Sequence, residues 1–182
     1  SSIGGGSVTT TGVQTYTDVV TLGSHTSLSG STVTFVDTLD GTVAGEESLA
    51  ITGDAVFADA VGTTSLESLT VSGTSSLNGG SVTTTGIQTY TDSATLGADT
   101  TMTGSIVTFV ATLDGTIAGT ESLAITGNGV FGGTVGTTLL ELLTVSGTSV
   151  INGGTVTTTG LQTYTGAMTL GADSTLTTAG GS

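Results

Sequence analysis

The stretch Gly-Val-Gln-Thr-Tyr-Thr at residues 12–17 returns as Gly-Ile-Gln-Thr-Tyr-Thr at 86–91 and as Gly-Leu-Gln-Thr-Tyr-Thr at 160–165. The spacing is 74 residues both times, and residues 5–78 match residues 79–152 at 53 of 74 positions. A third, partial copy covers 153–182 and follows the pattern to about Thr177. A long fixed period of this kind indicates a repeat architecture. Residues 1–182 are therefore predicted to form one continuous segment.

Short strands are predicted throughout the repeat. Runs such as Val33-Thr34-Phe35-Val36 and Leu69-Thr70-Val71 combine β-branched and aromatic residues, which is typical of strands. Gly-Gly and Asp-Gly pairs lie between these runs and favour turns. No window of a dozen residues keeps a helical hydrophobic period without Gly or clustered Thr. Helix content is therefore expected to be close to zero.

Glycines that end apolar runs subdivide the repeat. Gly23, Gly53 and Gly73 are 30 and 20 residues apart, and 24 more residues lead to the next copy. We interpret these intervals as three unequal coils of about 25 residues, although four shorter coils also fit. The fold class predicted is an all-β β-solenoid, built from a 74-residue repeat of about three coils each. About seven coils stacked at about 4.8 Å would form a rod about 35 Å long.

The composition limits the partners of this chain. Its 182 residues include 14 Asp and Glu, one His and no Lys, Arg, Pro, Cys or Trp, and the formal net charge is −14. Nucleic-acid phosphates and anionic lipid headgroups are bound through Lys and Arg, so neither is an expected partner. No stretch approaches 18 apolar residues, and no membrane insertion is predicted. Because Ser1–Gly5 aligns with Ser75–Gly79, we expect a piece of a longer protein.

Gln-Thr-Tyr-Thr is the most regular polar element and has two interpretations. In the first, Tyr16, Tyr90 and Tyr164 form a row that binds a ligand. In the second, each Tyr packs on the rod while the preceding Gln forms hydrogen bonds along the axis. Equivalent tyrosines three coils apart would be separated by about 14 Å, too far to stack. The packing interpretation is favoured.

The acidic residues raise the question of calcium. Ca²⁺ requires about six to eight oxygen ligands in close proximity, whereas equivalent carboxylates of successive copies would lie about 14 Å apart. We therefore expect a solvated acidic face and predict no metal or cofactor site. The recurring carboxylates are Asp40 and Asp114, Glu47 and Glu121, and Glu67 and Glu141.

Threonine runs such as Val8-Thr9-Thr10-Thr11 and Val156-Thr157-Thr158-Thr159 suggest a hydroxyl array like that of ice-binding solenoids. That function needs a Thr-x-Thr row on every coil of one face. The intervening coils are expected to contribute Ala58-Asp59 or Thr34-Phe35 instead. The array is therefore predicted to be interrupted.

No catalytic set is predicted. His25 occurs once, its counterparts are Asp99 and Asp173, and it is expected to be exposed in a loop. A nucleophile, a base and an orienting group cannot be assembled around it. Polysaccharide-active β-helix enzymes carry clefts made by loop insertions, and no insertion interrupts this repeat, so we expect no enzyme. The recurring phenylalanines are predicted to pack in the core: Phe35 and Phe109, and Phe57 and Phe131.

The Leu-x-Val-x-Gly runs, Gly-Gly-Ser-Val-Thr-Thr-Thr-Gly at 79–86 and Gln-Thr-Tyr-Thr resemble the repeats of large bacterial surface proteins. The family they resemble is the filamentous-haemagglutinin-like adhesins and related giant β-solenoid exoproteins. Membership would imply a right-handed β-helix shaft, secretion to the cell surface, and a role as fibre or adhesive stalk.

The expected function is mechanical. A ladder-bonded rod gives stiffness and protease resistance without disulfides, so the chain is interpreted as a structural segment of an extracellular filament or cell-surface fibre. The expected partner is the chain itself, through continuous or end-to-end stacking at unpaired strand edges. The alternative is an adhesin shaft that binds a glycan or host surface through a lateral face, which a glycan screen and mutation of Gln14 and Tyr16 and their repeats would test. Thr178–Ser182 is a candidate cap.

Overall fold

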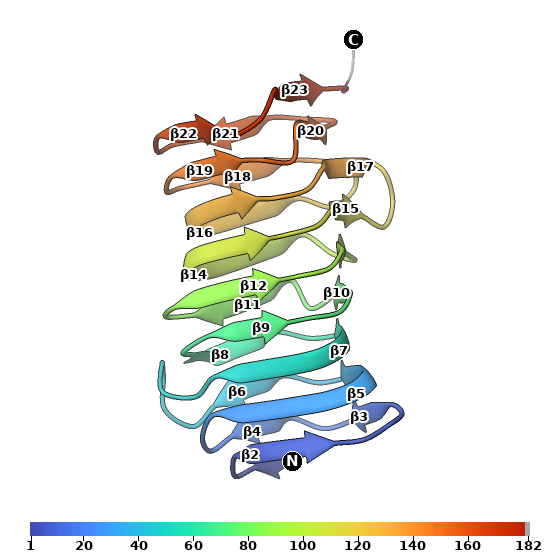
Figure 1. Ribbon diagram of the computed structural model, residues 1–182, viewed down its shortest axis with the longest axis vertical. Coiled ribbons are helices and arrows are strands. Elements are labelled where there is room, and N and C mark those ends of the chain that lie inside the picture. Colours follow the sequence, from blue (N-terminus) through green and yellow to red (C-terminus); the bar gives the residue numbers. More distant parts are fainter. Residues whose placement is uncertain (181–182) are drawn as a thin grey trace.

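The computed structural model describes residues 1–180. These residues form 23 strands joined in one sheet in which every strand pair is parallel. The described part of the chain contains no helix, and hence none that could cross a membrane. In Figure 1 the near strands run left to right while the chain climbs from the N-terminus to the C-terminus, so the coil is right-handed. The predicted all-β solenoid is confirmed.

Three ladders of strands run the length of the rod, because each strand segment pairs with the third segment before it and the third after it. We call them walls A, B and C. Wall A contains β1 (Ser2–Ile3), β4 (Val20–Leu22), β6 (Leu39–Gly41), β8 (Val61–Leu66), β11 (Ser81–Thr84), the first parts of β14 (Thr100–Phe109) and β16 (Leu123–Phe131), β18 (Leu143–Val145) and β21 (Gln162–Tyr164). Wall B contains β2 (Gly6–Thr9), the first parts of β5 (Thr26–Phe35) and β7 (Leu49–Phe57), β9 (Leu69–Val71), β12 (Ile87–Tyr90), the second parts of β14 and β16, β19 (Ser149–Ile151) and β22 (Met168–Leu170). Wall C contains β3 (Gln14–Tyr16), the second parts of β5 and β7, β10 (Ser75–Leu77), β13 (Ala94–Leu96), β15 (Leu113–Gly115), β17 (Val135–Leu140), β20 (Thr155–Thr158) and β23 (Thr175–Thr178).

The rod has about nine turns of about 20 residues. The prediction of seven longer coils is therefore wrong in number, and the rod is about 40 Å long at the usual strand spacing. The reason is that the glycines mark corners between walls rather than complete turns. From Gly53 to Gly73 the chain makes one turn, but from Gly23 to Gly53 it passes four strand segments, which is one and a third turns.

One 74-residue repeat therefore contains eleven strand segments, or three and two-thirds turns. Equivalent residues of successive copies consequently lie on different walls. Figure 1 shows the result for the long strands: β5 and β7 bend from wall B into wall C, whereas their counterparts β14 and β16 bend from wall A into wall B. Each copy is rotated by one wall relative to the copy before it.

The core is a narrow column of stacked aliphatic and aromatic side chains. In wall C, Phe35 stacks on Tyr16 and Phe57 with ring centroids 5.2 and 5.6 Å apart. In wall B, Phe109 stacks on Tyr90 and Phe131 at 5.1 and 6.0 Å. All four phenylalanines are buried, which confirms their predicted place in the core. Stacked aromatic pairs of this kind add stability beyond their buried area.

Two buried serines interrupt this column. The hydroxyls of Ser75 and Ser149 are buried and have no hydrogen-bond partner. In the ladder, Ser75 is flanked by Ala55 on one side and by Ala94 on the other. A hydroxyl left without a partner in an apolar environment lowers stability.

Ser75→Ala is therefore expected to stabilise the protein by about 1 kcal/mol, because it removes a buried polar group and leaves the packing unchanged. The measurement is chemical denaturation followed by circular dichroism. The matched control is Ser76→Ala in the same strand, where the side chain points outward and the change should be close to zero. A destabilised Ser75→Ala would contradict the assignment of an unpaired hydroxyl.

Candidate functional site

The Gln-Thr-Tyr motif forms a buried polar network. In the second copy, Gln88 Nε2 donates to the carbonyl oxygens of Val82 and Thr103 at 3.2 and 2.8 Å. It also lies 3.3 Å from Thr84 Oγ1, and Tyr90 Oη donates to Gln88 Oε1 at 3.2 Å. Gln88 and Tyr90 are both fully buried. Since Thr103 belongs to the next turn, the Gln joins two turns along the axis, as the packing interpretation predicted.

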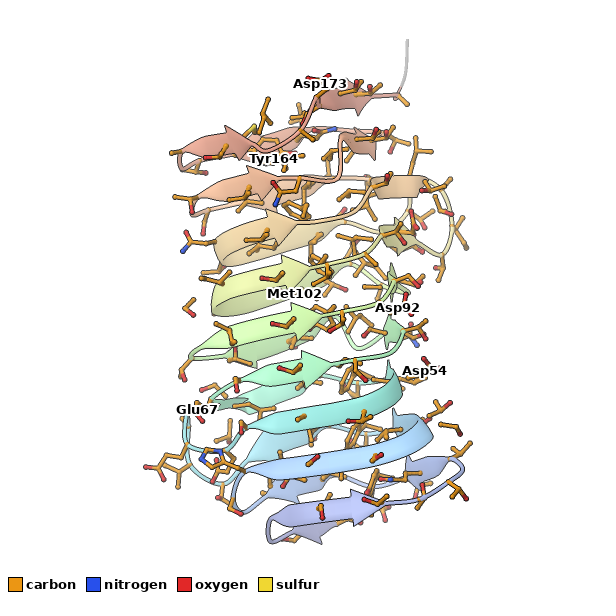
Figure 2. All side chains as sticks on the ribbon, viewed as in Figure 1. Asp54, Glu67, Asp92, Met102, Tyr164 and Asp173 are labelled. Atoms are coloured by element: carbon orange, nitrogen blue, oxygen red, sulfur yellow. The ribbon has the colours of Figure 1, made fainter. Side chains whose placement is uncertain are left out.

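The tyrosines do not form a ligand platform. Tyr16, Tyr90 and Tyr164 point inward from walls C, B and A respectively, so each faces the core from a different direction. Tyr164 lies near the C-terminal end of the rod (Figure 2). Burial raises the pKa of Tyr90, and it raises the pKa of Tyr164 to about 12. These phenols therefore stay neutral and act as hydrogen-bond donors inside the rod.

The inward position of these side chains also corrects the adhesin hypothesis at one point. Gln14 is buried, and its Nε2 donates to Ser29 O at 2.7 Å. Tyr16 is half-buried, and its hydroxyl donates to Gln14 Oε1 at 3.1 Å. Gln14 and Tyr16 are therefore not available to a lateral binding surface, because both side chains hold the strand in place.

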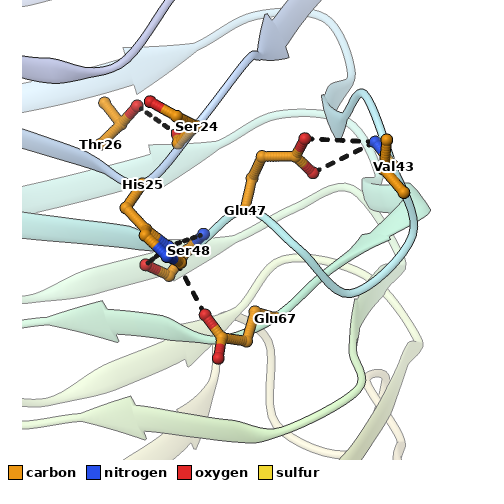
Figure 3. Close-up of polar contacts among 7 residues, drawn as sticks. All are labelled: Ser24, His25, Thr26, Val43, Glu47, Ser48 and Glu67. Atoms are coloured by element: carbon orange, nitrogen blue, oxygen red, sulfur yellow. Dashed lines mark hydrogen bonds and ion pairs between the residues drawn. The ribbon is translucent and has the colours of Figure 1, made fainter.

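Two carboxylates are buried at the loops that follow β6 and β15. Glu47 is 3 % exposed and Glu121 is 5 % exposed, so the prediction that they lie on a solvated face is wrong. The Val43 N–H donates to both carboxylate oxygens of Glu47 at 3.2 Å (Figure 3), and Thr42 Oγ1 donates to Oε1. Gly41 leaves the space for this carboxylate, because a Cβ there would lie 2.5 Å from Glu47 Oε2.

These hydrogen bonds set the protonation of both groups. The Thr42 hydroxyl lowers the pKa of Glu47. Burial raises the pKa of Glu121, but hydrogen bonds from Thr116, Thr120 and the Ile117 N–H outweigh it and the net pKa is lowered. Sequence reasoning missed this role because a Glu that follows a Gly-rich turn has the pattern of a solvated residue. Each carboxylate closes its own loop by joining the end of the loop to its beginning.

The double variant Glu47→Gln and Glu121→Gln is expected to lose part of the pH dependence of stability. A carboxyl whose pKa is lower in the folded state than in the unfolded state stabilises the fold above the unfolded value, and the contribution disappears as pH falls through the folded value. The original chain should therefore be more stable than the variant at pH 7, and the difference should shrink as pH falls below the ordinary value of 4.5 and disappear below the lowered pKa values of the folded state. Urea denaturation from pH 7 to pH 3 measures it. A constant difference across that range would contradict the role of the carboxylates.

The remaining acidic residues do not come together. Asp40 Oδ1 accepts the Thr64 N–H at 2.9 Å, and Asp114 Oδ1 accepts the Thr138 N–H at 3.0 Å. Glu67 lies at the opposite edge of the view from Asp54 (Figure 2). Among residues 1–180 there is no group of three or more His, Cys, Asp or Glu side chains that could hold a metal ion.

His25 is exposed, as predicted, and acts as a hydrogen-bond acceptor at a corner. Its Nδ1 lies 2.8 Å from Ser48 Oγ, accepts the Ser48 N–H at 3.3 Å and lies 3.5 Å from Glu67 Oε2 (Figure 3). Its counterpart Asp99 accepts the Ser122 N–H through Oδ1 at 2.8 Å. His25 thus replaces a carboxylate in one corner contact, which is a structural role.

The threonine runs lie on strands β2, β11 and β20 of walls B, A and C. Their neighbours in adjacent turns differ from those predicted. Residues 7–9 pair with 27–29, and 27–29 pair with 50–52, so the next turns contribute Ser and Thr rather than Ala58-Asp59 or Thr34-Phe35. A strict Thr-x-Thr row is thus interrupted, as predicted, but by Ser27, Ser29 and Ala50 rather than by the residues expected.

These observations define a three-walled β-solenoid whose repeated internal elements stabilise the rod. No protein-family model, no curated protein and no solved structure matches the chain. The described residues form no pocket. The outer surfaces of the walls, the loops at the corners and the unpaired strand edges at the two ends of the rod are therefore the parts of the described chain that can contact another molecule.

Proposed function

We propose that this chain is a shaft segment of an extracellular filament or cell-surface fibre. The observation that carries the proposal is the continuity of the three ladders through about nine turns. A globular binding domain has no need of such a rod, whereas a fibre requires a unit that can be extended without change of cross-section. The resemblance to filamentous-haemagglutinin-like exoproteins supports a secreted protein of a bacterial surface.

Stiffness follows from the direction of the bonds. The backbone hydrogen bonds of each wall run along the rod axis from one turn to the next, for example from Val36 N to Tyr16 O at 2.9 Å and from Ala58 N to Phe35 O at 2.9 Å. Bending the rod would stretch one wall and compress the other two. The close-packed core resists this compression, so the rod is stiff. The same continuous pairing protects the backbone from proteases, because its hydrogen-bonding groups are already paired.

Self-association is the proposed partner interaction. In the described chain, β1 to β3 and β21 to β23 pair on one side only. An unpaired parallel edge is a template for another strand. A further turn, from a longer chain or from a second copy, would continue all three ladders.

The adhesin alternative has one observation in its favour. The loops at 42–48 and 116–122 lie outside the ladders and expose apolar side chains, with Val43 49 % and Ile117 65 % exposed. Because the copies are rotated by one wall, the two loops occupy different corners. Screening of the chain against glycans tests this function, with Val43→Asp and Ile117→Asp as variants that should abolish any binding.

The shaft function is tested in two ways. Chains with one and two added 74-residue repeats should lengthen by about 18 Å per repeat in electron micrographs, at constant width. Labelling of intact producing cells with an antibody should place the protein outside the cell, on projecting fibres. Label confined to the cell interior would contradict the proposal, as would added repeats that widen the particle.

A further inference from the structure

Walls A and B each carry two parallel columns of outward hydroxyls. Strand residues alternate between the core and the outside, and the outward pair brackets one inward residue in each of five consecutive turns. Nine of the ten outward positions on each wall are Ser or Thr. On wall B these are Ser7 and Thr9, Ser27 and Ser29, Ala50 and Thr52, Thr70 and Ser72, and Thr89 and Thr91. On wall A they are Ser81 and Thr83, Thr101 and Thr103, Ala124 and Thr126, Thr144 and Ser146, and Thr163 and Thr165.

We call the two hydroxyl columns of one wall its array. The ladders of backbone hydrogen bonds hold each array in register. Ser81 pairs with Thr101 and Thr83 with Thr103, and both pairings continue into the next turn. Beyond the strand ends the ladder continues through backbone bonds, such as Ser146 N to Ile125 O at 3.0 Å. The hydroxyls therefore form a two-dimensional lattice fixed by the backbone.

The hydroxyls are free to bind a ligand. Ser72 Oγ and Ser146 Oγ each accept one backbone N–H, at 3.1 and 3.0 Å. The other array hydroxyls make no hydrogen bond to any group of the part of the chain that the structure describes. No array position is charged. The arrays thus present neutral hydroxyl and methyl groups on a rigid surface.

The two copies differ in a way that preserves the array. Of the ten positions, only two change between walls B and A, Ser27 to Thr101 and Ser29 to Thr103, and both keep a hydroxyl. Between those two positions the buried residue changes from Leu28 to Met102. Because each copy is rotated by one wall, the same array recurs on the neighbouring wall. Thr155 and Thr157 begin a third array on wall C.

The spacing of the lattice identifies the ligand. Adjacent turns lie about 4.8 Å apart, and alternate residues of a strand lie about 6.7 Å apart. These two distances are close to the two oxygen repeats of a prism face of ice. Threonine hydroxyls can join ordered waters at these positions, as bridging waters do elsewhere. We propose that walls A and B bind the surface of ice, a function separate from that of the shaft.

The test is the thermal hysteresis of the full chain, measured with the inhibition of ice recrystallisation. The double variant Ser27→Tyr and Thr101→Tyr places one bulky ring in the second of the five turns of each array. The matched control, Thr34→Tyr and Thr95→Tyr, places the same rings on wall C, where the outward neighbours at 36 and 97 are Val and Gly. We expect hysteresis in the original chain and in the control, and loss to the buffer level in the array variant.

Two results would overturn the proposal. One is the absence of both activities in a chain whose circular dichroism shows the β-solenoid. The other is equal activity of the array variant and the wall C control. Neither result bears on the shaft, whose test is rod length and location on the cell, so the two proposals succeed or fail separately.

Discussion

Gly127→Ala is expected to lower the free energy of unfolding by about 4 kcal/mol, because backbone strain and overlap of the new Cβ with a neighbouring atom act together. Gly127 has a φ of 134°, a conformation that L side chains rarely adopt, and a Cβ there would lie 1.8 Å from Gly104 O. That oxygen belongs to the backbone of the turn below and cannot move without opening the ladder. Gly147 N also donates to Gly127 O at 2.8 Å, so the disturbance reaches the turn above.

The matched control is Gly12→Ala. Gly12 occupies a corner of the same kind in the first copy, but its φ is not positive and a Cβ there would meet no atom within 4 Å. The expected change is within about 0.5 kcal/mol. Urea denaturation of both variants, followed by circular dichroism, measures the difference. Similar stabilities for the two variants would show that the close approach at this corner relaxes at little cost.

The sequence predicts the strands and the core of this rod well, for a physical reason. In a ladder each inward position meets its equivalents in adjacent turns, so Phe35 and Phe57 must be compatible with one another and with Tyr16. Such repetition leaves a period in the sequence that can be counted without a structure. The all-β content and the buried aromatic residues follow from it directly.

The arrangement of the walls could not be predicted in the same way. A glycine such as Gly23 shows that the chain bends, but it does not show how many bends complete a turn. The strand β8 adds a further difficulty, because its pairing with β11 aligns Val61 with Val82 and Leu66 with Thr84. The extra residues between Val61 and Leu66 form a bulge, so residue spacing does not convert into turns. This error hid the hydroxyl arrays.

The burial of Glu47 and the lowering of its pKa could also not be predicted from the sequence. A solvated Glu and a Glu that accepts two loop hydrogen bonds have the same residue pattern in the sequence. The two cases differ in the structure, where the missing side chain of Gly41 leaves space for the Glu47 carboxylate. The repetition of the Gly and Glu pair at 115 and 121 was the available signal. A Gly and a Glu that recur together in each copy of a repeat therefore predict a contact between the Glu carboxylate and the space at the Gly.

Gln88→Leu is expected to cost about 3 kcal/mol, because several buried groups lose their partner at once. Leucine has a similar volume, so little of the loss comes from a cavity. It would leave the Tyr90 hydroxyl without an acceptor inside the core, and the carbonyl of Thr103 would lose the donor that joins it to the turn below. Urea denaturation of the purified chain measures the change.

The three copies of the motif supply the controls for this prediction. Gln162 makes the same contacts, at 3.2 Å to Val156 O and 2.8 Å to Thr177 O, but it is only half-buried. Water can satisfy the groups that Gln162→Leu leaves, so we expect a loss of about 1 kcal/mol or less. Thr89→Ala changes the outward neighbour of Gln88 and should have almost no effect. If Gln88→Leu and Gln162→Leu lost equal stability, the loss could not come from burial of the network, and the motif would act through its strand propensity alone.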